Sequence, residues 1–337
     1  MFTFVDSRQT KTRMDIIDII RKPILNEMQL FRETFVTSLK TDNPLLSNVN
    51  EYILQKSGKQ LRPMLSILAA KMCGEVNQAS INGALSLELL HTASLVHDDV
   101  VDDTLERRGV PSINAHWNNK IAILSGDYML SKSLNCASQT NNLRILAAIS
   151  KIGMELSDGE LLQLAVAEQL KISESEYFKV IQKKTAFLFS ACTEVGGLSV
   201  GASDDKLIHL RNFGEYMGIC FQIKDDIFDY TEDAQIGKPT GNDIREGKVT
   251  LPLIHALENA NNQEKEMVMN MIRNKEFSAE NIQSITQFAH KNGGVAYAAK
   301  QMDLYKQKAI AELIHFEDCE AKTSLELCAE FAAMRKS

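Results

Sequence analysis

Two aspartate clusters have the residue types and spacing to bind a cation. The first is Asp98-Asp99-Val100-Val101-Asp102 and the second is Asp225-Asp226-Ile227-Phe228-Asp229, so both read Asp-Asp-x-x-Asp. Residues four apart share one face of a helix, so the outer aspartates of each cluster are expected to project together. A single cluster of this kind is usually a solvated helix end. The same pattern twice, with apolar residues between the carboxylates, instead predicts two faces that wall a cation-binding cavity.

The carboxylates suit Mg²⁺ better than the other common metals. Neither cluster has the alternating oxygen ligands and central glycine of an EF-hand loop, or the His and Cys set of a zinc site. Mg²⁺ keeps several waters and accepts phosphate oxygens as further ligands. We therefore expect Mg²⁺ together with a di- or triphosphate substrate. The chain has no Gly-x-x-x-x-Gly-Lys-Ser/Thr motif, which excludes a P-loop NTPase.

Basic residues near the clusters would hold the phosphates, because Arg and Lys donate charge-assisted hydrogen bonds to phosphate oxygens. The candidates are Lys59, Arg62, Arg107, Arg108, Lys183, Lys184, Lys238 and Lys248. Each pair alone would be an ordinary set of surface side chains. As a group beside the carboxylates they indicate a diphosphate site. His91 lies seven residues before Asp98, where a core position and a ligand role are equally reasonable.

The elements that position these residues are predicted to be helices. The chain has six prolines in 337 residues and none between Pro111 and Pro239. Long proline-free tracts rich in Leu, Ala, Ile, Lys and Glu favour helix. Leu85, Leu89 and Val96 also follow a helical stride. The chain is therefore expected to be all-α, with its site built from side chains that face the core of a helical bundle.

Composition limits the class of protein further. No linker divides the chain, so we expect a loose tail at 1–13 and one domain at 14–337, with Met14 as an alternative start. Thirty-seven Lys and Arg against 44 Asp and Glu give a net charge of -7, which argues against nucleic acid as a partner. The six cysteines lack disulfide or zinc spacing, and there is no signal or membrane-spanning stretch, so a cytoplasmic protein is expected.

The motifs resemble those of the all-trans isoprenyl (polyprenyl) diphosphate synthases, of the medium- or long-chain type. The matching segments, in the family's order, are Gly58–Pro63, both aspartate clusters, Arg107-Arg108-Gly109, Lys184-Thr185, Phe221-Gln222 and Gly237–Asp243. The resemblance implies a single-domain orthogonal helical bundle with a central cavity, the isoprenoid synthase fold, and a homodimer. It also implies transfer of an allylic prenyl group to isopentenyl diphosphate.

The resemblance further implies a role for each matching residue. Asp98 and Asp102 would bind two Mg²⁺ ions and Asp225 a third, with Asp99, Asp226 and Asp229 in support. Isopentenyl diphosphate would be held by Lys59, Arg62, His91 and Arg108, and the allylic diphosphate by Arg107, Lys184, Thr185, Gln222, Lys238 and Lys248. The residues at the reacting groups would be Asp98, Asp102, Arg107, Lys184, Asp225 and Lys238.

Product length is expected to depend on Ala93 and Ser94, one helical turn before Asp98. Short-chain relatives carry bulky aromatic residues there, so these small side chains predict a product of roughly C30 to C50, such as a quinone side chain. The primer would be farnesyl or geranyl diphosphate. Met129 and Ser133 are candidates for the end of the product tunnel. The same small residues would also suit close helix packing, and a C15–C20 product remains the alternative.

Two other functions share parts of this pattern. A class I terpene cyclase has the same fold and the first cluster, but carries an Asn/Ser/Glu metal triad in place of the second. A non-catalytic subunit of a heteromeric synthase usually lacks one or both clusters. The intact second cluster disfavours both.

A long prenyl product would bring at most peripheral membrane contact, because no amphipathic anchor is evident.

Overall fold

The computed structural model describes residues 16–55, 58–107, 109–168, 173–231 and 241–335, and these residues confirm the all-α prediction. The elements are α1 (Ile16–Arg21), η1 (Lys22–Ile24), α2 (Leu25–Ser38), α3 (Pro44–Leu54), α4 (Leu61–Cys73), α5 (Gln78–Val101), β1 (Glu106–Arg107), β2 (Val110–Pro111), α6 (Ile113–His116), α7 (Asn119–Ser138), α8 (Leu143–Glu168), α9 (Glu174–Ile181), η2 (Gln182–Ala186), α10 (Phe187–Ser199), α11 (Asp204–Phe228), α12 (Asn242–Arg245), α13 (Leu251–Asn259), α14 (Asn262–Arg273), α15 (Ala279–Lys291), α16 (Gly294–Glu312), η3 (Leu313–His315) and α17 (Glu320–Met334). The strands β1 and β2 form one short antiparallel pair.

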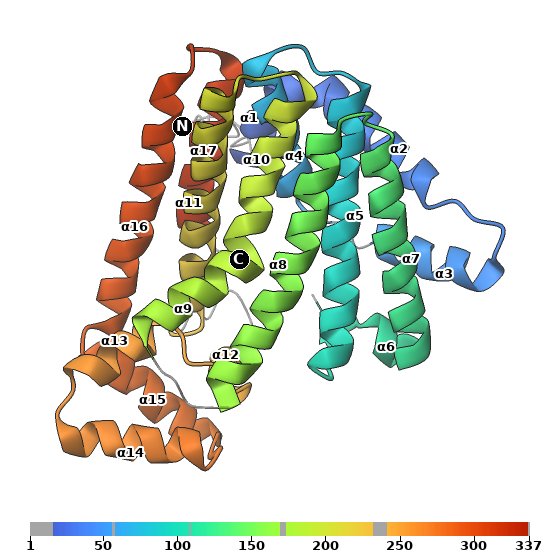
Figure 1. Ribbon diagram of the computed structural model, residues 1–337. Coiled ribbons are helices and arrows are strands. Elements are labelled where there is room, and N and C mark those ends of the chain that lie inside the picture. The colour runs from blue at the N-terminus through green and yellow to red at the C-terminus, as the bar shows by residue number, and fades with distance from the viewer. Residues whose placement is uncertain (1–15, 56–57, 108, 169–172, 232–240, 336–337) are drawn as a thin grey trace, which may run out of the picture.

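Long helices α5, α7, α8, α10, α11 and α16 run along one direction of the molecule (Figure 1). Helices α4 and α10 lie inside this group, and most of their residues are buried. A helix that is apolar on all sides belongs in a core rather than on a surface. The two aspartate clusters lie at the ends of α5 and α11, so the main core holds the helices that carry the site.

A second, smaller core joins α13, α14 and α15 at one end of the long helices (Figure 1). Tyr230 belongs to this core and is fully buried. It directly follows Asp229, and its main-chain oxygen accepts a hydrogen bond of 2.7 Å from His290 Nε2. The end of the second aspartate cluster is therefore anchored in the smaller core.

Some expectations fall on parts of the chain that are not described. The tail at 1–13, Arg108 and Lys238 all lie outside the described residues. None of the described helices has a stretch that is both long enough and apolar enough to cross a bilayer.

Candidate active site

The first aspartate cluster ends helix α5. Asp102 forms the C-cap, with its N–H bonded to the Asp98 main-chain oxygen at 2.8 Å, and Asp103 follows with a positive φ of 49°. Burial raises the pKa of Asp98 to about 6, with a further rise from the charges of Glu160 and Asp102 that outweighs the opposing Lys184 and Arg107. Burial, more than the neighbouring charges, therefore disfavours the ionised form of Asp98.

Asp99 faces a different set of partners and is buried. Arg107 Nε donates to its Oδ1 at 2.6 Å, and Asn114 donates to its main-chain oxygen at 3.1 Å. Burial raises the pKa of the Asp99 carboxyl, and Arg107 opposes that rise. Arg107 is thus fixed beside the cluster by Asp99, within electrostatic reach of Asp98.

The second cluster ends helix α11, and each of its carboxylates has its own partner. Asp225 Oδ1 forms an ion pair of 2.6 Å with Arg335. Asp226 is buried and accepts from the Tyr177 hydroxyl at 2.6 Å and from Gln222 Nε2 at 2.9 Å. Burial raises its pKa, as does the nearby charge of Asp243.

Asp229 serves as a cap for the short helix α12. Its carboxylate accepts from the backbone N–H of Asn242 at 2.7 Å and of Asp243 at 3.0 Å. The outer aspartates of this cluster therefore have separate partners, although the helical spacing predicts that they project together. Separate partners are compatible with a shared face, because Asp229, the C-cap residue, keeps helical backbone angles.

Lys184 and Thr185 lie on η2, a π-helical turn between α9 and α10. Such turns are rare and often occur at functional sites. Lys184 pairs with Glu160 and donates to Gln163 Oε1 at 3.1 Å. The Thr185 hydroxyl donates to Gln222 Oε1 at 2.8 Å, which ties η2 to α11.

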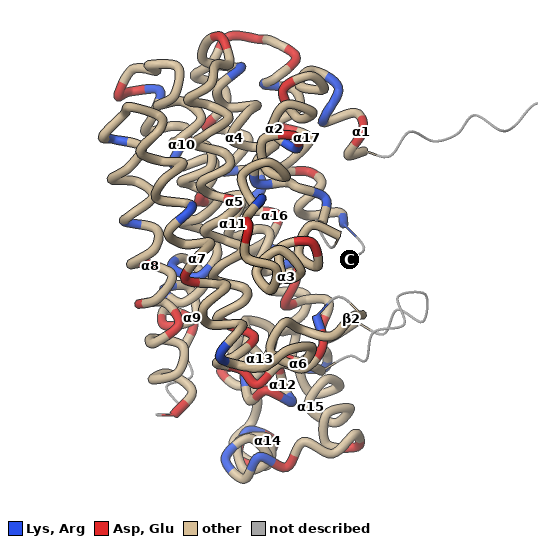
Figure 2. Tube along the Cα trace, turned by 90° about the vertical axis from the view of Figure 1, so that its right-hand side faces the viewer, with Lys and Arg blue, Asp and Glu red and all other residues tan. Residues whose placement is uncertain are grey.

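Lys248 lies on the segment that follows the second cluster, within electrostatic reach of the first. Burial lowers its pKa, but its contact with Glu246 at 2.6 Å and the charges of Asp102 and Asp243 raise the pKa above the ordinary value. The influence of Asp102 places the end of the first cluster near the segment that follows the second. In Figure 2, acidic and basic residues gather together around α12, where that segment lies.

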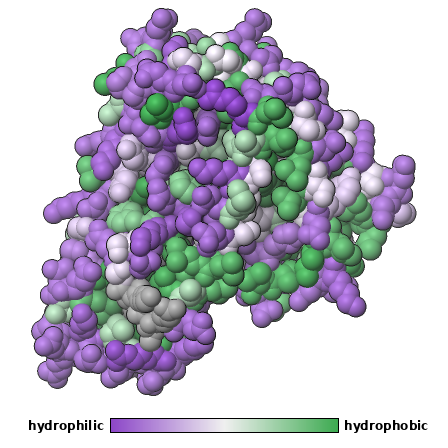
Figure 3. Space-filling view, viewed as in Figure 1, coloured by the Kyte–Doolittle hydropathy of each residue, from purple (hydrophilic) through white to green (hydrophobic). Residues whose placement is uncertain are grey.

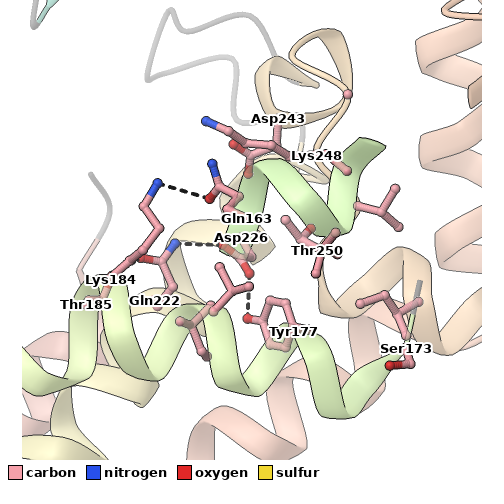
Figure 4. A pocket seen from close by; sticks show the side chains of 17 residues that line it. Gln163, Ser173, Tyr177, Lys184, Thr185, Gln222, Asp226, Asp243, Lys248 and Thr250 are labelled. Carbon is pink, nitrogen blue, oxygen red and sulfur yellow. Dashed lines mark hydrogen bonds between the residues drawn. The ribbon is translucent and has the colours of Figure 1, made fainter. Parts of the chain in front are cut away.

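A cavity of about 220 Å³ opens among α8, α9, η2, α11 and the segment from 243 to 254. Figure 4 shows Lys184, Gln222 and Asp226 at one side, joined to Gln163 and Tyr177 by hydrogen bonds, with Asp243 and Lys248 above them. Its other walls are mostly apolar, namely Val166, Ala167, Val180, Ile181, Val249 and Ile254. A cavity with cations at one side and an apolar wall suits an anionic group attached to a hydrocarbon.

The residues expected to bind isopentenyl diphosphate lie on neighbouring elements of the main core. Lys59 precedes α4, and its Nζ is 5.4 Å from the centre of the Phe331 ring. Arg62, on α4, has its guanidinium 5.2 Å from the centre of the Phe189 ring. His91 is half-buried on α5, which packs against α4.

The chemistry of the donor set fits a divalent cation. Asp98, Asp102 and the exposed part of Asp225 offer the oxygen ligands that Mg²⁺ prefers. Within the described part of the chain, however, acidic, His and Cys side chains form no group of three or more that could hold a metal ion by themselves. Both clusters lie at the C-terminal end of a long helix, where unsatisfied carbonyl groups add negative potential.

Residues 43–289 match the family described as Polyprenyl synthetase. The chain belongs to this family, whose members are prenyltransferases. It is 33% identical to the octaprenyl diphosphate synthase of Haemophilus influenzae, over 92% of this chain and 94% of that protein.

The chain is also similar to solved structures of synthases of this kind. A geranylgeranyl pyrophosphate synthase from Bacteroides thetaiotaomicron is 40% identical, with a TM-score of 0.83 over 96% of this chain and 100% of that one. A polyprenyl synthase from Caulobacter crescentus CB15, complexed with calcium and isoprenyl diphosphate, is 30% identical, with a TM-score of 0.90 over 95% and 98%. The isoprenoid synthase fold expected for the synthase is confirmed.

The two chain-length candidates of this synthase lie where α5 packs against α7. Ala93 is 2% exposed, and the Ser94 hydroxyl donates to the His91 main-chain oxygen at 2.9 Å. His97 contacts the α7 backbone at Gly126, where a Cβ would come within 2.3 Å of its ring.

The two candidates for the tunnel end lie on α7. The Ser133 hydroxyl donates to the main-chain oxygen of Ser86 on α5 at 2.8 Å. Ser86 is eleven residues before His97, so this contact lies further along α5 from the aspartate cluster. Met129 is fully buried between the Gly126 and Ser133 contacts.

Four residues of the site had no role predicted from the sequence. Glu160 and Gln163 hold Lys184, Tyr177 holds Asp226, and Arg335 holds Asp225. Glu160 and Gln163 are three apart, a spacing that places them on one face of α8 and could have suggested a shared partner. Tyr177 and Arg335 are joined to the clusters only by the tertiary fold.

Proposed function

We propose that this protein is a Mg²⁺-dependent trans-prenyltransferase that adds successive isopentenyl units to an allylic diphosphate. The observation that carries the proposal is the placement of Lys184 and Lys248, which line the cavity beside Asp226 and lie within electrostatic reach of Asp98 and Asp102 respectively. Like charges held close together are costly unless a cation neutralises them. A diphosphate that brings Mg²⁺ supplies both the cation and an anion for the lysines.

The reaction starts with cleavage of the allylic C–O bond, whose electron pair leaves on the diphosphate. Lys184, Lys248 and Arg107 stabilise this developing negative charge. Because their positions are fixed before the reaction, they need no reorganisation, and electrostatic stabilisation of this kind is usually the largest single contribution to catalysis. Bound Mg²⁺, which we expect as three ions, would supply Lewis-acid stabilisation of the same leaving group. Lys184 projects from η2 and forms an ion pair with Glu160, with which the substrate diphosphate would compete.

The allylic carbon then forms a new bond with the double bond of isopentenyl diphosphate, which extends the chain by one C5 unit. Loss of a proton restores a double bond, and the departing diphosphate is the base closest to that proton. No protein base is required. Lys59, Arg62 and His91, with Arg108, would hold isopentenyl diphosphate from the α4 and α5 side of the core. The apolar walls of the cavity reduce the water available to trap the allylic cation.

We propose a product of roughly C30 to C50, made from farnesyl or geranyl diphosphate and suited to a quinone side chain. The support is the small side chain of Ala93 on the buried face of α5, below Asp98. The relatives include both an octaprenyl and a geranylgeranyl synthase. A C20 product is therefore the second candidate, favoured by the 40% identity to the latter.

We also propose that the protein forms a homodimer through α7 and α8. Figure 3 shows apolar side chains gathered along this face, and the exposed ones include Ile123, Leu124, Leu130, Leu134, Leu143, Met154, Leu161 and Leu164. Sedimentation would test it with Leu124→Glu, which should yield monomer. Ile314→Glu is the matched control, because Ile314 on η3 is equally exposed and should leave the dimer intact.

A product assay tests the function. Purified protein would receive labelled isopentenyl diphosphate and farnesyl diphosphate, with Mg²⁺ or EDTA, and the dephosphorylated products would be sized. We expect Mg²⁺-dependent products longer than C25, and Ala93→Phe should shorten them towards C15 while Ala93→Ser keeps their length. Products that stop at C20 would support the shorter-chain enzyme. No incorporation by folded protein would favour a terpene cyclase or a non-catalytic subunit.

A further inference from the structure

Arg335, the last residue that the structure describes, reaches from the end of α17 into the second aspartate cluster. Its guanidinium forms the 2.6 Å ion pair with Asp225 and donates to the Phe221 main-chain oxygen at 2.9 Å. The guanidinium carbon is 3.6 Å from the centre of the Phe221 ring and 5.7 Å from that of Phe228. One charged side chain therefore contacts three residues in the last two turns of α11.

This contact is built into the fold rather than being a surface ion pair. The Arg335 side chain is 8% exposed, against 42% for Asp225. Its main-chain N–H bonds to the Phe331 oxygen at 2.9 Å, and Phe331 is itself buried in the main core. Exposed ion pairs contribute little because water competes with them, whereas a stacked and buried guanidinium keeps its position.

The placement of Arg335 is otherwise unfavourable. Its Nε is buried without a hydrogen-bond partner. Lys224 lies close enough that the positive charge of Arg335, together with burial, lowers the pKa of the lysine. A buried guanidinium beside a second cation requires a strong counter-charge. Asp225 is its ion-pair partner, so the two side chains hold each other.

We propose that Arg335 is a positioning residue for the second aspartate cluster, which holds Asp225 as its internal counter-ion and competes with a divalent cation for that carboxylate. The inference rests on the proposed function, in which Asp225 is a metal ligand. A carboxylate oxygen that accepts from a guanidinium has one less lone pair to give to a metal. In the first cluster the cation Arg107 is bound to Asp99, whereas the proposed function assigns the metal to Asp98 and Asp102. The second cluster should therefore take up metal more weakly than the first.

The test is direct binding of Mn²⁺, a spectroscopic stand-in for Mg²⁺, to the full chain. Comparing Mn²⁺ binding by wild type and by Asp225→Asn identifies the component of the binding that depends on Asp225. Arg335→Gln should tighten this component by about two- to ten-fold, the range expected when a partly buried ion pair no longer competes. Arg335→Lys keeps the charge and should remain near wild type. Arg273→Gln is the matched control, because it removes one positive charge from an exposed pair on α14.

Thermal unfolding in EDTA provides a second readout. Arg335→Gln and Asp225→Asn should be non-additive there, since each removes the same ion pair, and the non-additivity should shrink at saturating Mn²⁺. If Arg335→Gln does not fold, Arg335→Met is the second variant to test. It keeps an apolar side chain over the Phe221 ring but removes the charge.

Three results would overturn the proposal. Unchanged or weaker Mn²⁺ binding in the uncharged variants would reduce Arg335 to a structural contact. Additive effects on unfolding in EDTA would mean that the ion pair contributes nothing. If Asp225→Asn leaves Mn²⁺ binding untouched, Asp225 is not a metal ligand, and the metal role in the proposed function fails as well.

Discussion

The two aspartate clusters share one sequence pattern but differ in the partners that their carboxylates bind. In the first, the cation Arg107 is paired with Asp99, and burial is the main cause that raises the pKa of Asp98. In the second, all three carboxylates have partners, which are Arg335, the Tyr177–Gln222 pair and the N-terminus of α12.

This difference indicates two kinds of cation site. At the first cluster Arg107 is bound to Asp99, so a cation that binds Asp98 and Asp102 does not have to displace it. A cation at the second cluster must displace an internal partner. The same five-residue pattern can therefore produce an open site or a satisfied one, depending on what the tertiary fold brings to it.

The largest effect is expected for Asp98→Asn, which weakens the open cluster. Prenyl transfer should fall by about 10²- to 10³-fold, the range for loss of one group that stabilises developing charge. Asp103→Asn is the matched control: it removes the same charge from an exposed neighbour, and Asn tolerates the positive φ found there. Initial rates at saturating Mg²⁺ would measure both. Equal losses would mean that net charge, not position, matters.

Gly159→Ala should disturb the lysine that lies between the clusters. A Cβ at Gly159 would come 2.8 Å from Lys183 Cβ and 3.0 Å from Lys184 Cγ, so η2 must shift. Overpacking of this kind costs about 1–3 kcal/mol, and KM for the allylic substrate should rise more than kcat falls. Gly153→Ala, on the same helix, meets only Leu90 at 3.9 Å and should leave kinetics unchanged. Similar kinetics for the two variants would rule out close packing as the reason for Gly159.

Asp229→Ala should act on stability whether or not metal is present. Loss of an N-cap carboxylate costs about 1 kcal/mol, here because the N–H groups of Asn242 and Asp243 lose their acceptor. Asp229→Asn keeps an acceptor oxygen and should cost much less. Chemical denaturation in EDTA and in Mg²⁺ would measure both variants. A loss seen only with Mg²⁺ would show instead that Asp229 acts mainly as a ligand.

A smaller effect is expected in the pH dependence of the metal-free protein. The pKa of Asp98 rises from 3.8 to about 6 on folding, so between these values the folded protein binds more protons than the unfolded chain. Stability should therefore fall as pH rises through this window and level off above it. Asp98→Asn removes this contribution. In EDTA, the Tm of the variant should therefore rise relative to the wild-type Tm as pH increases from 4 to 6. Parallel Tm curves for the two proteins would contradict the raised pKa of Asp98.

Much of the helical fold could be predicted from the sequence, and the site residues stay a prediction. Proline spacing and helical periodicity indicated the helices, and the repeated aspartate pattern indicated the site. The partners of the clusters could not be predicted, because Tyr177 and Arg335 lie 49 and 110 residues from the aspartates they contact. Their contacts depend on how α9 and α17 pack against α11, and no local pattern reports that packing. The contact of Asp229 with the N-terminus of α12 is likewise tertiary, since Asp229 ends its own helix and caps another.

The most direct test of the difference between the clusters is an Mn²⁺ titration of the substrate-free protein, followed by electron paramagnetic resonance. Wild type, Asp98→Asn and Asp225→Asn would be compared at one pH above 7. We expect a tighter component that Asp98→Asn removes and a weaker one that Asp225→Asn removes. The account would be contradicted if Asp225→Asn removed the tighter component, or if both variants weakened a single component equally.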